Sequence, residues 1–373
     1  MKIKIYWGDR TFFEESIKNE IEENSLTLSE YLRILEEKKI EIKSNSDSES
    51  IDLLEKNIKN TLPNLVCYSD DFLSLSDSGL NNFLSVSYNS KIDNNIIQNP
   101  PNLIKEKLEH SKLISKEKFC IYNKITLDII EIFAKDFNKK IIGQESARNE
   151  LIKALFKKSK KNKPLIIMLY GPSGVGKTET AKFIAKLFKQ KLFRKQFSMF
   201  QTTTYGEYLF GDSHNKNSLA KDLLDRESNI ILFDEFDKTS NFFHSAFYQL
   251  FDEGIYVDKN YIVNLKDSII LCTSNYRNLN ELKNALGAPL FYRFDHLIEF
   301  KELNDEAKLK IIEIYLNKSF NELIEDDKKV VRLNEHKQKL DKVVKKLNNV
   351  RQIKNLIENL FLDDLVKKEI KNY

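Results

Sequence analysis

Cysteine and histidine are scarce in this sequence, and their spacing excludes two kinds of site. The chain of 373 residues has three cysteines, Cys67, Cys120 and Cys272, and five histidines. No two cysteines form a CxxC pair and no histidines have the spacing of metal ligands, so we expect neither a disulfide framework nor a zinc site. Free thiols are typical of a reducing compartment, which favours a cytoplasmic protein.

Long apolar runs and a large excess of one charge are also missing. No stretch approaches the roughly 18 apolar residues of a membrane-spanning helix, and the first residues, MKIKIYWGDR, contain no apolar signal segment. We therefore expect no membrane association. Lys and Arg number 60 against 56 Asp and Glu, a net charge of +4, which is too small for a protein that coats nucleic acid. Hydrophobic residues make up 41% of the chain, enough for a sizeable core.

Residues 1–115 carry mixed patterns that do not define a fold. A short alternating stretch is followed by charged helical patterns, a polar link at residues 44–50 and sequence rich in Asn and Ser. Two interpretations stay open, namely a small helical accessory domain and a domain that recognises a partner or substrate. We expect this N-terminal accessory region, of unknown fold, to end at residue 115.

Residues 116–300 alternate short apolar runs with helical patterns. The runs have the length and β-branched content of strands that are buried on both faces. They lie at residues 165–170, 230–234, 268–274 and 296–300. Strands that alternate with helices predict an α/β domain with a parallel sheet flanked by helices. Residues 301–373 show helical patterns only, which predicts a small all-α domain.

A glycine-rich turn follows the first apolar run. Residues 171–178, GPSGVGKT, match the P-loop pattern G-x-x-x-x-G-K-[ST]. The glycines let backbone N–H groups point at phosphate oxygens, and the following helix adds its positive N-terminal end. We expect Lys177 to contact the β- and γ-phosphates of ATP, and the Thr178 hydroxyl to bind Mg²⁺. The predicted cofactor-binding residues of this turn are Gly171, Pro172, Ser173, Gly174, Val175, Gly176, Lys177 and Thr178.

Two acidic residues end the second apolar run. In NIILFDEFDK, Asp234 and Glu235 follow four apolar residues, which is the Walker B form. Because ligands collect at the carboxyl ends of parallel strands, both side chains should lie beside the P-loop. Asp234 is predicted to hold Mg²⁺, directly or through water. Glu235 is predicted to orient and activate the attacking water as a general base.

These motifs, their spacing and the helical C-terminal region resemble the AAA+ ATPases, and among them the second ATPase module of Clp-type chaperones. The resemblance covers residues 120–373, and it implies that the C-terminal helical domain is a lid. KKIIGQESARNELIKAL, at residues 139–155, is similar to the segment that precedes the P-loop in this family. The similarity implies that Ile142 and Gly143 pack on adenine. SIILCTSN implies that its last residue, Asn275, hydrogen-bonds the γ-phosphate or the water.

The resemblance also implies two arginines that act on the phosphates. Arg293, in GAPLFYRFDHLIEF, would be the arginine finger that reaches the nucleotide of a neighbouring subunit, which implies a homo-oligomer such as a ring. Family members usually have Arg-Pro where this chain has Ala288 and Pro289, and a surface arginine paired with Asp295 is the alternative. Arg351, in NNVRQIKNLIENL, would be the sensor-two residue that contacts the phosphates within one subunit.

The loop with which Clp-type unfoldases grip polypeptide has no obvious counterpart. The region that corresponds to its Gly-Tyr-Val-Gly motif is polar, DSHNKNS at residues 212–218. Tyr205 or Tyr208 could replace the missing aromatic residue, or both could pack inside the module. Tyr256 and Tyr261, in a second loop, could face a central channel.

The sequence therefore favours an ATP hydrolase that remodels a protein partner as a homo-oligomer, with ATP and Mg²⁺ as cofactors. One alternative is a slow-turnover switch or scaffold in a multi-protein system, which the missing aromatic residue favours. A second is a DNA-acting AAA+ ATPase, supported only by the basic run KKSKKNK at residues 157–163. That run is also compatible with a solvated connection between a helix and a strand.

Overall fold

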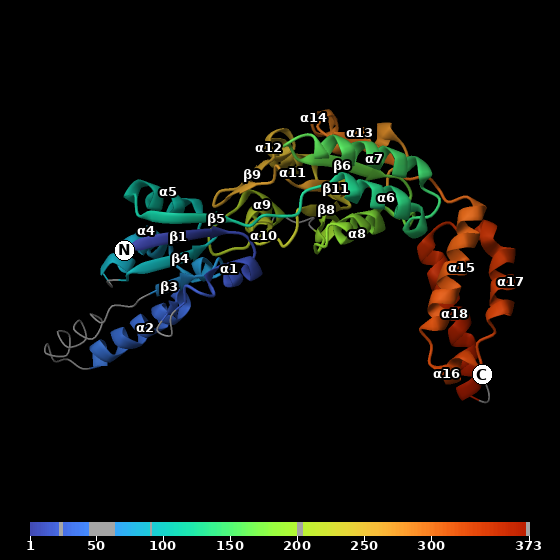
Figure 1. Cartoon of the computed structure of the whole chain (residues 1–373), viewed down its shortest axis with the longest axis horizontal. Helices are drawn as coiled ribbons and strands as arrows, with labels where there is room; N and C mark the ends of the chain where they lie inside the picture. The colour runs from blue at the N-terminus through green and yellow to red at the C-terminus, as the bar shows by residue number, and fades with distance from the viewer. Residues whose placement is uncertain (22–24, 45–63, 90–91, 200–203, 371–373) are drawn as a thin grey trace. The chain divides into compact units, whose positions relative to one another are not determined.

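Two compact units make up the chain, and Figure 1 labels their helices and strands. The computed structural model describes residues 1–21, 25–44, 64–89, 92–199 and 204–370. The first unit contains Met1–Tyr122, Gln201–Glu227 and Ser245–Lys266, and the second contains Asn123–Phe200, Ser228–His244 and Asp267–Tyr373. The predicted polar link lies, beyond Ser44, outside the described residues. The predicted division at residues 115 and 300 stays a prediction.

A five-stranded parallel sheet organises the first unit, so the hypothesis of a small helical domain at residues 1–115 is wrong. Its order is β2-β3-β4-β1-β5. The strands are β1 (Lys2–Trp7), β2 (Leu26–Thr27), β3 (Asn64–Cys67), β4 (Asn94–Gln98) and β5 (Ile114–Phe119). Ile5 and Ile97 are fully buried, whereas the edge strand β5 has five exposed residues. These strands are short and partly polar, so they lack the continuous apolar runs by which buried strands are recognised.

Helices of the N-terminal part of the first unit pack with this sheet in one core. They are α1 (Arg10–Ile17), α2 (Leu28–Ser44), the 3₁₀ helix η1 (Asp71–Ser74), α4 (Asp77–Asn89) and α5 (Asn102–Ser111). The Asp9 carboxylate caps α1 by accepting a hydrogen bond from the Phe12 N–H at 3.0 Å. Phe72, Ile104 and Leu108 pack from these helices into one core with the buried strand residues.

Two later segments of the chain also belong to the first unit. They contain α9 (Thr204–Phe210), α10 (Leu219–Leu224), η4 (Ser245–Phe247), α12 (Tyr248–Glu253) and the antiparallel hairpin of β9 (Ile255–Val257) and β10 (Ile262–Asn264). Asp225, after α10, accepts hydrogen bonds from Asn99 at 2.7 Å, from Ser69 at 3.1 Å and from Lys221 at 3.0 Å. Segments far apart in the sequence are thus joined by a partly buried polar network.

The second unit contains the predicted parallel sheet, with the order β12-β6-β11-β8-β7. The strands are β6 (Leu165–Tyr170), β7 (Phe193–Gln196), β8 (Ile230–Asp234), β11 (Ile269–Thr273) and β12 (His296–Glu299). All residues of β6, β8 and β11 are buried, as expected for strands that are covered on both faces. Four strands match the four predicted apolar runs, and β7 was not predicted.

Helices flank this sheet and continue into the C-terminal region, which confirms the predicted fold class. The elements beside the sheet are α6 (Leu127–Lys140), α7 (Glu145–Ser159), α8 (Lys177–Leu187), η2 (Phe197–Met199), η3 (Phe236–Lys238), α11 (Asn241–His244), α13 (Leu279–Leu286) and α14 (Ala288–Phe291). The C-terminal elements are α15 (Asp305–Asn321), α16 (Glu325–Lys328), α17 (Leu333–Val343), η5 (Val344–Lys346) and α18 (Val350–Glu369). None of the helices in the described ranges has the length and apolar character needed to cross a membrane.

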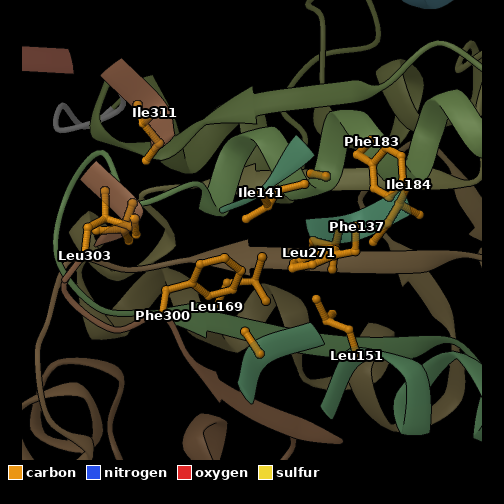
Figure 2. Packing of buried hydrophobic residues seen from close by; sticks show 14 of the residues in the cluster. Phe137, Ile141, Leu151, Leu169, Phe183, Ile184, Leu271, Phe300, Leu303 and Ile311 are labelled. Carbon is orange, nitrogen blue, oxygen red and sulfur yellow. The ribbon is translucent and has the colours of Figure 1, made fainter. Parts of the chain in front are cut away.

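One hydrophobic cluster joins the sheet of the second unit to its helices. Figure 2 shows Phe137 of α6, Leu151 of α7 and Phe183 of α8 around the buried strand residue Leu271. The cluster extends to Ile311 of α15 and to buried residues of α17 and α18. Burial of this apolar surface is the main force that orders the strand ends and the helix starts on which the site depends.

Candidate functional site

The P-loop joins β6 to α8 and requires glycine at its turns. Gly171, Gly174 and Gly176 have φ values of 130°, 73° and 113°, in the region that favours glycine. A Cβ atom at Gly171 would lie 2.0 Å from the carbonyl oxygen of Phe300. The sequence motif therefore specifies a backbone that other residues rarely adopt, and α8 begins directly after it at Lys177.

A cavity of about 520 Å³ lies at this loop. Its basic lining residues are Lys139, Lys140, Lys177, Arg194, Arg351 and Lys354, and its acidic ones are Glu179, Asp234 and Glu235. Six cations against three carboxylates leave an excess of positive charge, which favours a polyanion. Ile141, Ile142, Ile311, Ile314, Tyr315 and Val350 form an apolar part of the lining. The cavity therefore combines the two surfaces that a nucleoside triphosphate needs.

Most of the predicted site residues meet at this cavity. The predicted residues that line it are Ile142, Ser173, Gly174, Val175, Gly176, Lys177, Thr178, Asp234, Glu235, Asn275 and Arg351. The predicted residues that are not in its lining are Gly143, Gly171, Pro172 and Arg293. Gly171 and Pro172 still contribute to the site, because their carbonyl oxygens hold the Lys177 ammonium at 2.6 Å each.

The Lys177 ammonium lies near the centre of the polar groups. It also donates to Asn275 Oδ1 at 3.2 Å, which brings the predicted sensor residue to the P-loop. Its side chain is almost completely buried. Burial lowers the pKa of Lys177 to about 8, although the charges of Asp234, Asp237 and Glu235 favour its protonated form. A bound phosphate would add negative charge beside this ammonium and so favour its protonated form.

Asp234 ends β8 beside the first turn of α8. Its Oδ1 accepts from the Thr273 hydroxyl at 2.5 Å and lies 3.5 Å from the Thr178 hydroxyl. Its Oδ2 accepts from Arg194 Nε at 3.0 Å and from Arg194 Nη2 at 2.6 Å. The carboxylate and the Thr178 hydroxyl are oxygen donors of the kind that Mg²⁺ prefers. In the described structure, Arg194 supplies positive charge to the same carboxylate.

Glu235 adopts a strained backbone next to Asp234. Its φ is 54° and its ψ is 43°, in the left-handed region that non-glycine residues rarely occupy. The Glu235 N–H donates to the Thr273 hydroxyl at 2.8 Å, and its carboxylate accepts from the Gln196 amide at 3.3 Å. Such strain is typical of functional sites, and here it aims the carboxylate at the cavity.

Arg194 and Gln196 were missed by the sequence analysis. Both belong to β7, two residues apart, so their side chains share one face of the strand. Parallel pairing places Gln196 opposite Asp234. The sequence FRKQ has no apolar run, and the pairing of two distant strands leaves no local pattern. The one signal in the sequence is the spacing of Arg194 and Gln196, which lie two residues apart and so would share one polar face of a strand.

The C-terminal helices close one side of the site. The Val350 N–H, at the start of α18, donates to the Gly174 carbonyl at 3.1 Å. Asn349 caps this helix through the Gln352 N–H at 3.0 Å. Arg351 therefore reaches the cavity from the first turn of a helix that is hydrogen-bonded to the P-loop itself.

Gly143 lies behind the cavity rather than in its lining. Its φ is 75°, and a Cβ atom there would lie 2.8 Å from Ala307 Cβ in α15. Glycine at this position thus permits close packing of α15, while Ile142 lines the cavity. The implied contact of Gly143 with adenine stays a prediction.

Arg293 lies after α14 and outside the lining of the cavity. Its guanidinium donates to the Pro289 carbonyl at 2.6 Å. Asp295, the alternative partner considered for it, forms an ion pair with Lys157 at 3.3 Å and accepts from the Ile166 N–H at 3.0 Å. A role for Arg293 in a neighbouring subunit stays a prediction.

Three of the four tyrosines that were considered for a channel, Tyr205, Tyr256 and Tyr261, are buried in the first unit. Tyr205 is 1% exposed, which agrees with the interpretation that it packs inside the module. The Tyr208 hydroxyl donates to Asp222 at 2.5 Å. Tyr256 and Tyr261 are 0% and 1% exposed, so the prediction that they face a channel is wrong. Apolar packing against the first unit prevails over exposure in these loops.

Comparisons with known proteins identify the type of domain. Residues 162–325 match the sequence model of the family described as AAA domain (Cdc48 subfamily). The chain is 30% identical over 206 residues to the ATP-dependent Clp protease ATP-binding subunit ClpL of Staphylococcus aureus strains MRSA252 and USA300. That match covers 48% of the chain and 29% of the length of each relative.

A solved structure has a similar fold. It is a closed-state cryo-EM reconstruction of Hsp104 with ATPyS and FITC casein, with a TM-score of 0.57 and 14% sequence identity. The match covers 99% of this chain and 89% of that chain. The similarity at this identity concerns the fold alone. Residues 162–325 are therefore similar to an AAA domain, and the chain has distant similarity to less than a third of the length of ClpL.

Proposed function

We propose that this chain hydrolyses ATP in the presence of Mg²⁺ and uses the reaction to remodel a protein partner. The observation that carries the proposal is the convergence of Lys177, Asp234 and Glu235 on one cationic cavity at the P-loop. AAA domains as a family imply ATP and Mg²⁺ binding. We also keep a cytoplasmic location as part of the proposal, since the three cysteines are free.

Each side chain at the cavity has a role that follows from its chemistry. Bound Mg²⁺ would neutralise charge on the phosphate oxygens, and Thr178 and Asp234 would hold it. Lys177 supplies a point charge to the phosphates. Glu235 orients a water molecule and accepts its proton, and the uncharged Asn275 amide can donate to the same group.

Two arginines would complete the charge stabilisation. Arg351 would contact the phosphates from α18, which links the position of the C-terminal helices to the bound nucleotide. Arg293, which is not in the lining of its own chain's cavity, would act on the nucleotide of a neighbouring subunit. The active form is therefore proposed to be a homo-oligomer, such as a ring.

A mixing experiment tests the shared site. Arg293→Ala and Glu235→Gln chains are each expected to release phosphate slowly when alone. If Arg293 acts across an interface, mixed oligomers contain some sites with both wild-type residues, so the mixture regains activity. If mixed oligomers form but phosphate release does not recover, Arg293 does not act on the site of a neighbouring subunit.

Steady-state phosphate release tests hydrolysis itself. Glu235→Gln keeps the size and most contacts of the side chain but removes the base, so we expect turnover to fall by about 100-fold or more. ATP binding, measured on the same sample, should remain. Equal turnover of the wild type and Glu235→Gln would end the catalytic assignment.

Burial of the loop tyrosines favours a second candidate function. Because Tyr205, Tyr256 and Tyr261 are buried, the segments that contain them offer none of these aromatic side chains to a threaded polypeptide. A slow-turnover switch or scaffold that assembles with ATP needs no such side chains. It gains support if ATP changes the oligomer mass while phosphate release stays near background.

The DNA-acting alternative receives little support from the basic run at residues 157–163. Lys158 is buried and donates to the Lys163 carbonyl at 2.6 Å. Lys157 is paired with Asp295. Part of the run is therefore occupied by contacts within the fold, in agreement with its interpretation as a connection between α7 and β6.

A further inference from the structure

A second cavity, of about 280 Å³, lies within the first unit. Its walls come from the ends of β1 and β5, from α5 and from the hairpin of β9 and β10. The lining residues are Trp7, Gly8, Lys105, Phe119, Cys120, Tyr122, Leu224, Arg226, Ile255, Ile262, Val263 and Asn264. Carboxyl ends of parallel strands are the usual ligand-binding edge of such a sheet.

The charged residues in this lining are both cations. Lys105 Nζ lies 5.3 Å from the centroid of the Trp7 ring and 3.6 Å from the Glu109 carboxylate on the exposed side of α5. Arg226 is 8% exposed, and its guanidinium carbon lies 4.9 Å from the centroid of the Tyr122 ring. Among the residues that the structure describes, no acidic one lines the cavity. Its electrostatic preference is therefore for a carboxylate rather than for a basic group.

Exposed apolar side chains lie in the lining of this cavity and next to it on the hairpin. The Trp7 and Phe119 rings are stacked with their centroids 6.3 Å apart, and Phe119 is 59% exposed. On the hairpin, Ile262 is 54% exposed and its cross-strand partner Val257 is 40% exposed. Exposed apolar residues that gather beside a cavity are typical of a protein interaction site.

The size of the cavity narrows the class of ligand. At about 280 Å³ it is little more than half the volume of the 520 Å³ nucleotide cavity, so it suits one large side chain better than a nucleotide. Apolar residues outside the cavity add surface that only a longer ligand can cover. A peptide segment satisfies both conditions, whereas a small anion would leave Phe119 and Ile262 without a role.

We propose that this cavity docks an acidic segment of a protein partner, which inserts one large apolar side chain beside Trp7 and places carboxylates against Lys105 and Arg226. The acidic segment would belong to the partner that the chain remodels, so the biological role of docking rests on the proposed function. Docking at this cavity needs no nucleotide, so the docking site and the proposed ATP hydrolysis can be refuted separately.

Tryptophan fluorescence offers a direct assay, because Trp7 is the single tryptophan of the chain. The full chain is titrated with the capped synthetic peptide Asp-Asp-Phe-Asp-Asp. Two comparison peptides replace Phe by Ala or every Asp by Lys. We expect a saturable change of emission with the first peptide and about tenfold weaker binding, or none, with the others.

Two variants locate the interaction, and two matched variants control for general effects. Lys105→Glu alters a half-buried residue and Phe119→Ser an exposed residue of the cavity lining, and each should weaken peptide binding about tenfold or more. Lys153→Glu and Phe242→Ser make the same changes at exposed residues of the second unit and should leave peptide affinity unchanged. All four variants should retain MgATP binding.

Three outcomes would overturn the proposal. The first is no saturable response to the acidic peptide up to millimolar concentration. The second is equal affinity for all three peptides. The third is a change of oligomer mass in Phe119→Ser, which would assign the surface to a second copy of this chain. Loss of MgATP hydrolysis alone would instead count against the proposed function and leave the docking site standing.

Discussion

The buried Lys177 ammonium predicts how ATP affinity depends on pH. Burial lowers the pKa of Lys177 to about 8, whereas the phosphates of ATP favour the protonated form and raise this pKa in the complex. As the pH rises above 8, the bound state therefore holds up to one more proton than the free protein. ATP affinity should be nearly constant below pH 7.5 and should fall as the pH rises through 8.

The magnitude follows from the proton balance. With a pKa of about 8, the ammonium is mostly protonated at pH 7 and mostly neutral at pH 9. The dissociation constant of MgATP should consequently increase about tenfold between these values. The phosphate chain itself contributes little, because its last ionisation, near pH 6, is complete in this range.

Isothermal titration at pH 7, 8 and 9, in buffers of different ionisation enthalpy, measures both the affinity and the number of protons taken up. Lys177→Arg keeps a positive charge at every pH used, so any affinity that it retains should not vary with pH. Lys186→Met, an exposed change on the same helix, should keep the wild-type profile. A flat wild-type profile without proton uptake would refute the burial argument.

Three further changes test particular contacts. Arg194→Gln removes a cation that competes for Asp234, so the Mg²⁺ concentration for half-maximal ATP binding should fall about fivefold. Asp364→Asn removes a buried carboxylate. Burial alone would raise the pKa of Asp364, but its hydrogen bonds outweigh burial and hold this pKa well below its ordinary value. Without the carboxylate, the free energy of unfolding in urea should fall by roughly 2–3 kcal/mol. Gly171→Ala should cost about 3 kcal/mol or more in the same assay, whereas Gly287→Ala, where a Cβ would lie 3.7 Å from the nearest atom, should cost less.

The P-loop and the acidic strand end could be predicted because their information is local. The glycines of residues 171–176 are needed by the backbone at those positions, and the burial of β8 on both faces requires its apolar run. Lys177, Asp234 and Glu235 then meet because β6 and β8 both pair with β11 in parallel. Asn275 is placed by the same rule, two residues after the end of β11.

The remainder depends on pairing between distant segments. β1 lies between β4 and β5, and no pattern near residues 2–7 indicates either neighbour. Arg194 and Gln196 reach the site only through the register of β7 with β8. Tyr256 and Tyr261 have the sequence context of a loop, and their burial follows from packing within the first unit, to which residues 245–266 belong.

The magnesium dependence of ATP binding tests the central claim most directly. The full chain should bind ATP saturably and about tenfold more tightly with Mg²⁺ than with a chelator, because Thr178 and Asp234 hold the metal against the phosphates. Asp234→Asn should lose most of that difference. A chain that binds no ATP, or that binds it equally well with and without Mg²⁺, would contradict this assignment of the cavity.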